Sequence, residues 1–287
     1  MELGIGLPGY LGTRVEPQLV LDWARGADEA GFAAVSAHDR PDHDTWDPLA
    51  TLAVVAPITK RVRLATTILI LPPRDAGVVA KQGAVIDAVS GGRFELGVGV
   101  GARDQDYGAL GAEMRQRGSR FEEKLARIGE LWQRAIDAGD ESGVLGPPPV
   151  QRPRPPIRVG GYQPDALQRC VSLGDGYVFG VAGVEAMRAK VPEIREQYRA
   201  AGRPDLPIAG LAYVAATTDA GRLAQAEDNL KHYYGTLRKP FPEMVHTGDE
   251  AALRAKLDEY ADAGIDRLYL FPTLTELDQL DVLARLL

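Results

Sequence analysis

Short apolar runs alternate with longer amphipathic segments along almost the whole chain of 287 residues. A short run of β-branched and other apolar residues is typical of a buried strand, whereas apolar residues that recur every three or four positions indicate a helix. This pattern predicts eight strands, at residues 3–7, 32–37, 62–71, 93–98, 157–159, 177–179, 208–214 and 267–271. Each is followed by at least one helical segment. An open doubly wound sheet usually has about five or six strands, so the count favours a (β/α)8 TIM barrel in a single domain over residues 1–287.

Helix boundaries are marked by residues that commonly cap helices. Asp47 precedes Pro48 at the start of one helix, and Gly31 follows the last residue of another. The predicted helices cover residues 17–30, 48–59, 75–89, 119–138, 164–173, 185–201, 220–233, 249–263 and 274–287. Residues 139–156 are rich in proline and predict an extended, ordered loop inside the domain, because the alternation of strand and helix resumes directly after it. A second loop, also broken by proline, is expected to lead to Thr247.

Composition places the chain among globular proteins and excludes several classes of function. Hydrophobic residues make up 45% and charged residues 25% of the chain, which are ordinary values. A formal net charge of −7 without a basic run argues against a nucleic acid or an anionic membrane as a partner. The N-terminus has no signal-peptide pattern, and no apolar stretch approaches the roughly 18 residues of a membrane span, so we expect a cytoplasmic protein. The one cysteine, Cys170, excludes an intrachain disulfide and is expected to be a buried structural thiol.

The residues directly after the predicted strands indicate where a ligand binds, because the loops at the carboxyl ends of barrel strands carry function. These residues are rich in glycine and include no convincing pair of carboxylates, which argues against chemistry of the glycosidase type. Gly97, Gly99 and Gly101 alternate at the end of the fourth strand, where a backbone without Cβ atoms can approach a ligand closely. Gly160 and Gly161 stand between a strand and a helix, where free amides favour an anion. Together these glycines predict a site for a planar ligand with a phosphate tail.

The loop after the second predicted strand, residues 38–44, admits three interpretations. His38 directly follows the strand and is suited to donate a hydrogen bond or to transfer a proton near neutral pH. His38, Asp39, His43 and Asp44 are all plausible ligands of a metal ion. A charge-rich loop is also typical of a solvated surface without a further role. Because only His38 and Asp39 lie at the end of the strand, proton transfer is favoured over metal binding.

Several motifs, spread nearly end to end, carry a resemblance to a known family. They are Ala37-His38-Asp39, Trp46-Asp47-Pro48 and the stretches 63–72, 80–82, 90–99, 156–161 and 174–176. With these motifs the chain resembles the bacterial luciferase-like monooxygenases, a superfamily of flavin- and F420-dependent barrels. The resemblance implies a barrel that holds FMN, or alternatively the deazaflavin F420, at the carboxyl ends of its strands. Such a protein is an oxidoreductase, in some cases a monooxygenase, that acts on a small organic substrate.

The resemblance also implies which residues form the site. The cofactor-binding positions are Thr66, Thr67, Ile68, Gly99, Val100, Gly101, Gly160 and Gly161. The first three match a bulge in the third strand, where some members have a non-proline cis peptide bond behind the cofactor ring. The next three match the backbone beside the ring, and the last two match the phosphate turn. His38 matches a residue that faces cofactor and substrate, and a homodimer is a further expectation because members are commonly dimers.

Departures from the family pattern bear on the chemistry. Ala102 and then Arg103 stand where some F420 reductases carry a proton-donating carboxylate, and Arg103 is a candidate for orienting an anion. The 139–156 loop is shorter than in many members, which suggests an open site and favours hydride transfer over oxygen activation.

The leading hypothesis is therefore an FMN- or F420-dependent oxidoreductase without a metal. In this hypothesis His38 is a hydrogen-bond donor or an acid/base. Two alternatives stay open at this point. One is a metal-dependent barrel hydrolase that uses the 38–44 loop, and the other is a non-catalytic member of the family that binds a ligand.

Overall fold

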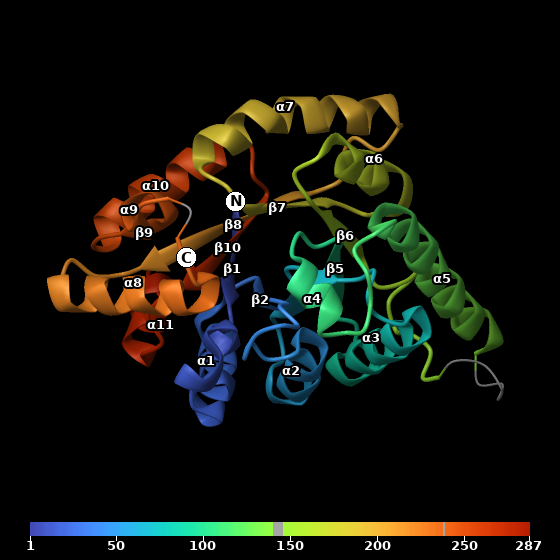
Figure 1. Ribbon diagram of the computed structural model, residues 1–287, viewed down its shortest axis with the longest axis horizontal. Coiled ribbons are helices and arrows are strands. Elements are labelled where there is room, and N and C mark those ends of the chain that lie inside the picture. The colour runs from blue at the N-terminus through green and yellow to red at the C-terminus, as the bar shows by residue number, and fades with distance from the viewer. Residues whose placement is uncertain (140–145, 238) are drawn as a thin grey trace.

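The computed structural model describes residues 1–139, 146–237 and 239–287. Parallel strands form a closed ring, and helices cover the outside of the ring (Figure 1). The ring consists of β1 (Glu2–Gly6), β2 (Ala34–Ala37), β3 (Arg63–Thr66) continued by β4 (Leu69–Ile70), β5 (Phe94–Gly99), β6 (Ile157–Gly160), β7 (Tyr177–Val181), β8 (Ile208–Ala215) and β10 (Arg267–Pro272). It closes because β10 pairs with β1 on one side and with β8 on the other. The predicted (β/α)8 barrel is therefore confirmed.

The helices follow the predictions, with ends that differ by a few residues. They are α1 (Pro17–Ala30), α2 (Pro48–Val55) with η2 (Ala56–Ile58), α3 (Ala76–Ser90), α5 (Arg117–Ala138), α6 (Pro164–Leu173), α7 (Val184–Ala200), α8 (Ala220–Tyr234), α10 (Glu250–Asp262) and α11 (Leu277–Ala284). Several begin at an aspartate whose side chain accepts a hydrogen bond from an amide of the first turn, as Asp47 does from Ala50. Such a cap satisfies an amide that has no partner within the helix.

Some segments differ from the prediction. The predicted strand 62–71 is divided into β3 and β4, and the peptide bond between Thr67 and Ile68, which lies between them, is cis. The loop before Thr247 contains α9 (Phe241–Met244) and β9 (Val245–Thr247), and β9 pairs with the end of β8. Elements of three or four residues are too short to show a periodicity, so the pattern missed them. The pattern also missed η1 (Pro8–Arg14) and α4 (Asp104–Gly108), which are shorter than two turns of an amphipathic α-helix or have 3-10 geometry. Residues 140–145 of the predicted 139–156 loop lie outside the described residues.

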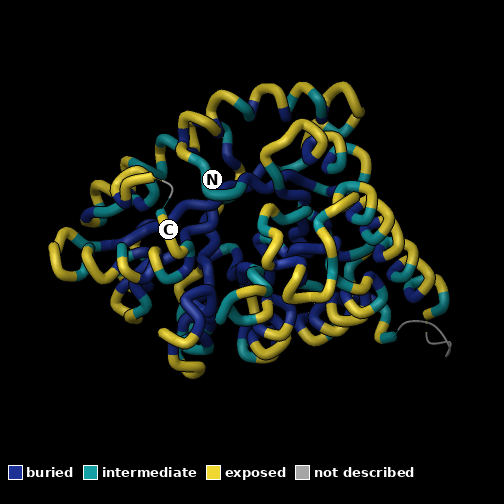
Figure 2. Tube along the Cα trace, in the orientation of Figure 1, coloured by how far each residue is buried: buried dark blue, intermediate teal, exposed yellow. Residues whose placement is uncertain are grey.

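Aromatic rings fill the inside of the barrel, and glycines opposite them make the necessary room. The strands are largely buried while the outer faces of the helices are exposed (Figure 2). Tyr269 and Phe271 of β10 are both fully buried. A Cβ at Gly4 would overlap the ring of Tyr269, and a Cβ at Gly6 would overlap the ring of Phe271. The glycines of β1 therefore set how far the rings of β10 reach across the barrel.

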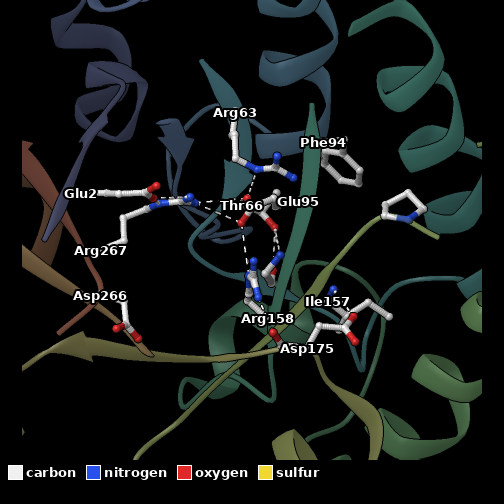
Figure 3. A network of polar contacts seen from close by, with 12 residues as sticks. Glu2, Arg63, Thr66, Phe94, Glu95, Ile157, Arg158, Asp175, Asp266 and Arg267 are labelled. Atoms are coloured by element: carbon white, nitrogen blue, oxygen red, sulfur yellow. Dashed lines mark hydrogen bonds and ion pairs between the residues drawn. The ribbon is translucent and has the colours of Figure 1, made fainter. Parts of the chain in front are cut away.

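A buried glutamate, Glu95, joins several strands at the N-terminal end of the barrel (Figure 3). Its side chain is 1% exposed and forms ion pairs with Arg63 of β3, Arg158 of β6 and Arg267 of β10. The distances from its carboxylate to Arg158 Nε and to Arg267 Nη1 are both 3.2 Å. Burial alone would raise the pKa of Glu95, but the three guanidinium groups lower that pKa to about 2. This end of the barrel, opposite to the glycine-rich loops, is thus held together by charge, as expected for the end that serves stability.

Cys170 of α6 has the structural role that the sequence predicts. Its thiol is buried, and Sγ lies 3.3 Å from the hydroxyl of Tyr198 on α7. Burial raises the pKa of Cys170 to about 11, so the thiol stays protonated at neutral pH. Among the helices that the structure describes, none is both long and apolar enough to cross a membrane.

Candidate active site

A cavity of about 300 Å³ lies at the carboxyl ends of the barrel strands. Seven of the eight predicted cofactor positions line it, namely Thr67, Ile68, Gly99, Val100, Gly101, Gly160 and Gly161. Its remaining wall includes Tyr162 and Gln163, which follow the fifth predicted strand, and Arg117 and Phe179, which the sequence pattern did not single out. Ligand pockets commonly have volumes of about 300–1,000 Å³, so the cavity is large enough for part of a cofactor. The two predicted glycine turns therefore converge on one place.

The floor of this cavity is built from glycines packed against Ile68. A Cβ at Gly99 would overlap the Cδ1 atom of Ile68, and a Cβ at Gly160 would lie 3.0 Å from its Cγ2 atom. Gly101, two residues beyond the end of β5, has a φ of +70°, a left-handed conformation that glycine adopts without strain. The backbones of β5 and β6 therefore lie flat beside Ile68, which suits a planar ligand.

Thr66 is the predicted cofactor position that does not line this cavity. Its hydroxyl donates a hydrogen bond to the carbonyl of Gly97 at 2.6 Å and accepts one from the amide of Gly97 at 2.9 Å. Both bonds join β3 to β5 beneath the cavity. Thr66 therefore lies outside the lining of this cavity, and its side chain joins the two strands beside it.

His38 follows β2 and lies buried beside the floor of the cavity. Its Nδ1 is 2.7 Å from the carbonyl oxygen of Thr67, so Nδ1 carries the proton and donates it. Its Nε2 is buried and has no hydrogen-bond partner among the described residues. The ring stacks on Phe271 with 3.9 Å between the ring centres. Burial lowers the pKa of His38 to about 4, although the bond to Thr67 opposes this shift, so the imidazole is neutral near pH 7 and offers Nε2 as an acceptor.

Tyrosine rings enclose His38 on its other sides. The rings of Tyr10, Tyr233 and Tyr213 lie 5.5, 5.8 and 6.4 Å from the imidazole centre. The hydroxyl of Tyr10 donates to the carbonyl of Pro272 at 2.6 Å, and the hydroxyls of Tyr213 and Tyr234 are 3.0 Å apart. Burial raises the pKa of Tyr10, Tyr213 and Tyr233, so this wall consists of neutral phenols.

The 38–44 loop does not bring its four potential metal ligands together. Asp39 forms an ion pair with Arg74 at 2.8 Å. His43 and Asp44 lie instead beside His232 of α8, and one ligand atom from each of these three residues lies within 4.8 Å of the others. The four residues that the sequence offered as plausible metal ligands therefore do not form one site, because the loop turns its two ends toward different neighbours. The carboxylate of Asp44 also accepts two hydrogen bonds from Thr13, which tie the loop to η1.

Arg103 stands at the barrel mouth but outside the glycine-lined cavity. It lines a second cavity of about 330 Å³, which adjoins the first because both are lined by Ala102, Tyr162 and Leu211. The Cζ atom of Arg103 lies 5.6 Å from the ring centre of Tyr234. The sequence therefore placed Arg103 correctly near the site, although it lines a different cavity from the cofactor positions.

Two arginines of the mouth were missed by the sequence analysis. Arg40 follows His38 by two residues, and its Cζ atom lies 5.3 Å from the ring centre of Tyr233. Arg40 could have been identified from the sequence, because it lies in a loop directly after a strand. Arg117, the first residue of α5, lines the glycine cavity, and no local signal marks it because its position depends on how α5 packs.

The cavity residues fit a flavin-type cofactor. Gly99 and Gly160 have no Cβ to push Ile68 away from the strand backbones, so Ile68 and these backbones together form a flat floor for a ring. Arg117 and the N-terminal end of α6, which begins at Pro164 next to Gln163, supply positive charge at the cavity edge for a phosphate. Fold and site together define a (β/α)8-barrel protein with a glycine-lined cavity at the carboxyl ends of its strands.

Comparison with known proteins gives the family. The sequence model of the luciferase-like monooxygenases matches residues 1–271, and the chain belongs to this family. Over 200 residues it is 26% identical to the oxygenase component of the flavin-dependent trigonelline monooxygenase of Acinetobacter baylyi. This match covers 66% of the chain and 56% of that relative, so the chain spans little more than half the length of this curated protein.

Solved structures share the fold over the whole chain. The monooxygenase RslO1 from Streptomyces bottropensis is similar with a TM-score of 0.84 and 21% identity, over 100% of this chain and 98% of that one. An F420-dependent secondary alcohol dehydrogenase, solved in complex with an F420-acetone adduct, is similar with a TM-score of 0.80 and 16% identity, over the same shares of the two chains. At these identities the likeness shows the fold alone.

Proposed function

We propose that this protein is a flavin-type oxidoreductase that binds FMN or F420 at the barrel mouth and acts on a small organic substrate. The observation that carries the proposal is the convergence of both glycine turns on one cavity, with His38 hydrogen-bonded to the floor of that cavity. Membership of the luciferase-like monooxygenase family supports it.

The residues of the cavity divide into those that would hold the ring and those that would hold the phosphate. Ile68, Gly99 and Gly101 form the flat floor for the ring. Gly161 and Arg117, with the start of α6, would bind the phosphate. When bound, such a cofactor carries electrons between the substrate and a second reactant.

FMN is the first candidate and F420 the second. The trigonelline relative is described as flavin-dependent, and Ala102 occupies the place of a carboxylate that some F420 reductases carry. F420 stays in the proposal because the alcohol dehydrogenase with a similar fold binds it.

His38 acts in this proposal as an acceptor at Nε2. Its Nδ1–H bond to Thr67 fixes the tautomer, and stacking on Phe271 fixes the plane of the ring. Because the imidazole is neutral near pH 7, Nε2 can take a hydrogen bond or a proton from a substrate group within reach. The buried tyrosines around it exclude water from this side of the mouth.

Absorbance titrations of the purified protein with FMN, riboflavin and F420 test the proposal. We expect FMN or F420 to bind with a Kd in the micromolar range. If the cofactor is FMN, it should bind at least about 10-fold more tightly than riboflavin, which lacks the phosphate, because a charge-assisted contact contributes about 1.5–3 kcal/mol. Arg117→Gln should weaken FMN binding and leave riboflavin binding unchanged, and oxygen uptake then shows whether oxygen is a reactant. Failure of both FMN and F420 to bind would contradict the proposal.

A further inference from the structure

Two guanidinium groups, those of Arg40 and Arg103, lie at the mouth without an acidic partner. Their Cζ atoms lie 5.3 and 6.0 Å from the ring centre of the same residue, Tyr233. Neither forms a hydrogen bond or an ion pair with a described residue, and Nε and Nη1 of Arg40 are buried as well. Asp106 and Asp42 lie near enough to act on Arg40 through space, but Asp106 accepts its hydrogen bond from the amide of Asp42.

Such an arrangement is unfavourable in the free protein. A buried polar group without a partner loses its hydrogen bonds to water and gains none in return. Burial and the neighbouring charge of Arg103 both lower the pKa of Arg40. An anion placed between the two groups would satisfy their donors and relieve their repulsion, which gives the arrangement a physical reason.

The position of this pair separates it from the cofactor phosphate. Tyr233, which both arginines approach, also stacks on His38, with 5.8 Å between the ring centres. The phosphate residues Gly161 and Arg117 line the glycine cavity, whereas neither Arg40 nor Arg103 lines it. The pair therefore lies on the side of the mouth where His38 offers its free Nε2.

We propose that Arg40 and Arg103 bind the carboxylate of a small organic substrate and direct its carbon skeleton toward His38. This inference rests on the proposed function, since it names the substrate class for that site. The planar guanidinium fork matches a carboxylate in two parallel hydrogen bonds. The rings of Tyr233 and Tyr234 beside the pair favour a flat skeleton over a highly hydrated one such as inorganic phosphate.

Calorimetric titration of the protein with benzoate and with its neutral analogue benzamide tests the inference. We expect benzoate to bind at least 10-fold more tightly than benzamide. Arg40→Gln and Arg103→Gln should each weaken benzoate binding at least 10-fold and leave benzamide and cofactor binding within twofold. Arg40→Lys should keep part of the affinity, because it keeps the charge and loses the fork. Arg199→Gln, which removes an exposed arginine near the end of α7, is the matched control and should change none of these values.

Each other outcome overturns the inference. Equal affinity for benzoate and benzamide would show that the two arginines do not form an anion site. Tighter binding of inorganic phosphate than of benzoate would show that the site does not select carboxylates. A loss of FMN or F420 affinity in Arg40→Gln, with benzoate binding unchanged, would assign the pair to the cofactor. Nε and Nη1 of Arg40 have no hydrogen-bond partner among the described residues, so Arg40→Gln should melt no lower than the wild type, and an unchanged melting temperature excludes misfolding as a cause. If neither cofactor binds while benzoate does, the proposed function fails and the anion site stands.

Discussion

At the scale of single residues, burial decides what His38 can do. An exposed histidine has a pKa near 6.5 and is partly charged at neutral pH, whereas in this site the pKa is about 4. The neutral ring donates through Nδ1 to Thr67 and keeps Nε2 free. The sequence indicated the residue, but the tautomer and the charge follow from what surrounds it.

The substitution His38→Asn distinguishes the role of Nδ1 from the role of Nε2. The asparagine amide can reproduce the Nδ1–H bond to Thr67, and it removes Nε2. We expect cofactor affinity within about twofold of the wild type and a loss of turnover of about 10²-fold or more, which is the usual contribution of a positioned acid or base. Steady-state kinetics and absorbance titration measure the two effects.

His38→Ala serves as the comparison, because it removes both nitrogens and the stacking on Phe271. Its cofactor binding should suffer as well as its turnover. In the wild type, kcat/KM should fall as the pH drops toward about 4, since protonation takes away the acceptor at Nε2. Full turnover by His38→Asn would exclude Nε2 from the reaction.

Whether a site residue could be predicted from the sequence depended on its position relative to the end of a strand. His38, Thr67 and Gly99 all follow or end a strand, and the rule for barrels placed them correctly at the mouth. Thr66 does not line the cavity, because its side chain hydrogen-bonds to Gly97 of the neighbouring strand, a contact that the sequence pattern does not reveal. Arg40 was missed because its burial results from loop packing, which leaves no periodic signal.

At the scale of secondary-structure elements, the close approach of β4, β5 and β6 shapes the cavity. Glycine at the ends of β5 and β6 lets Ile68 lie directly against both backbones. The elements themselves were largely predictable, because strands and helices of ordinary length carry a clear apolar period. The short elements α9 and β9 were not, and they form part of the wall of the second cavity through Met244 and His246.

Gly99→Ala tests this packing. The added methyl group would overlap Ile68, whose side chain would have to swing into the cavity. We expect cofactor affinity to fall at least about 10-fold and stability to fall by about 1–3 kcal/mol, the usual effect of overpacking. Binding titrations and urea unfolding measure these changes.

Two further variants test whether the overlap with Ile68 causes the loss of affinity. Adding Ile68→Ala to Gly99→Ala should restore part of the affinity, because it returns the space. Gly108→Ala is the matched control, since a Cβ there meets nothing within 4 Å, and it should bind the cofactor normally. Unchanged affinity in Gly99→Ala would mean that the floor does not contact the cofactor.

At the scale of the whole molecule, the two ends of the barrel have separate tasks. The N-terminal end is closed by the ion pairs of Glu95 with arginines from three other strands. The opposite end is lined by glycines, by neutral tyrosines and by arginines that form no ion pair with a described residue, and these groups stabilise little in the free protein. Stability concentrated at one end allows the other to keep groups that serve a ligand.

Glu95→Gln should destabilise the barrel by about 3–5 kcal/mol at pH 7, because it removes the buried negative charge that three guanidinium groups share. The wild type should lose this contribution as the pH falls from about 4.5 to about 2. The unfolded carboxyl takes up its proton near the ordinary value of 4.5, whereas in the folded state the pKa of Glu95 is about 2. Urea unfolding between pH 7 and pH 2 measures both effects.

The difference in stability between the two proteins should therefore narrow toward pH 2. Glu2→Gln is the control, because Glu2 pairs with the same Arg267 but its side chain is 58% exposed. Exposed pairs contribute about 0–1 kcal/mol, so this variant should stay within that range of the wild type. A Glu95→Gln protein as stable as the wild type at pH 7 would show that the network does not hold the strands.

The sequence by itself determined the eight-stranded barrel and the glycine turns at 99–101 and 160–161, because apolar periodicity and missing Cβ atoms act locally along the chain. Only the tertiary structure decided the charge of His38, the separation of Asp39 from His43 and the pairing of Arg40 with Arg103 around Tyr233. These properties depend on burial and on distances between segments that are remote in the chain. Neither quantity can be obtained from the local sequence pattern.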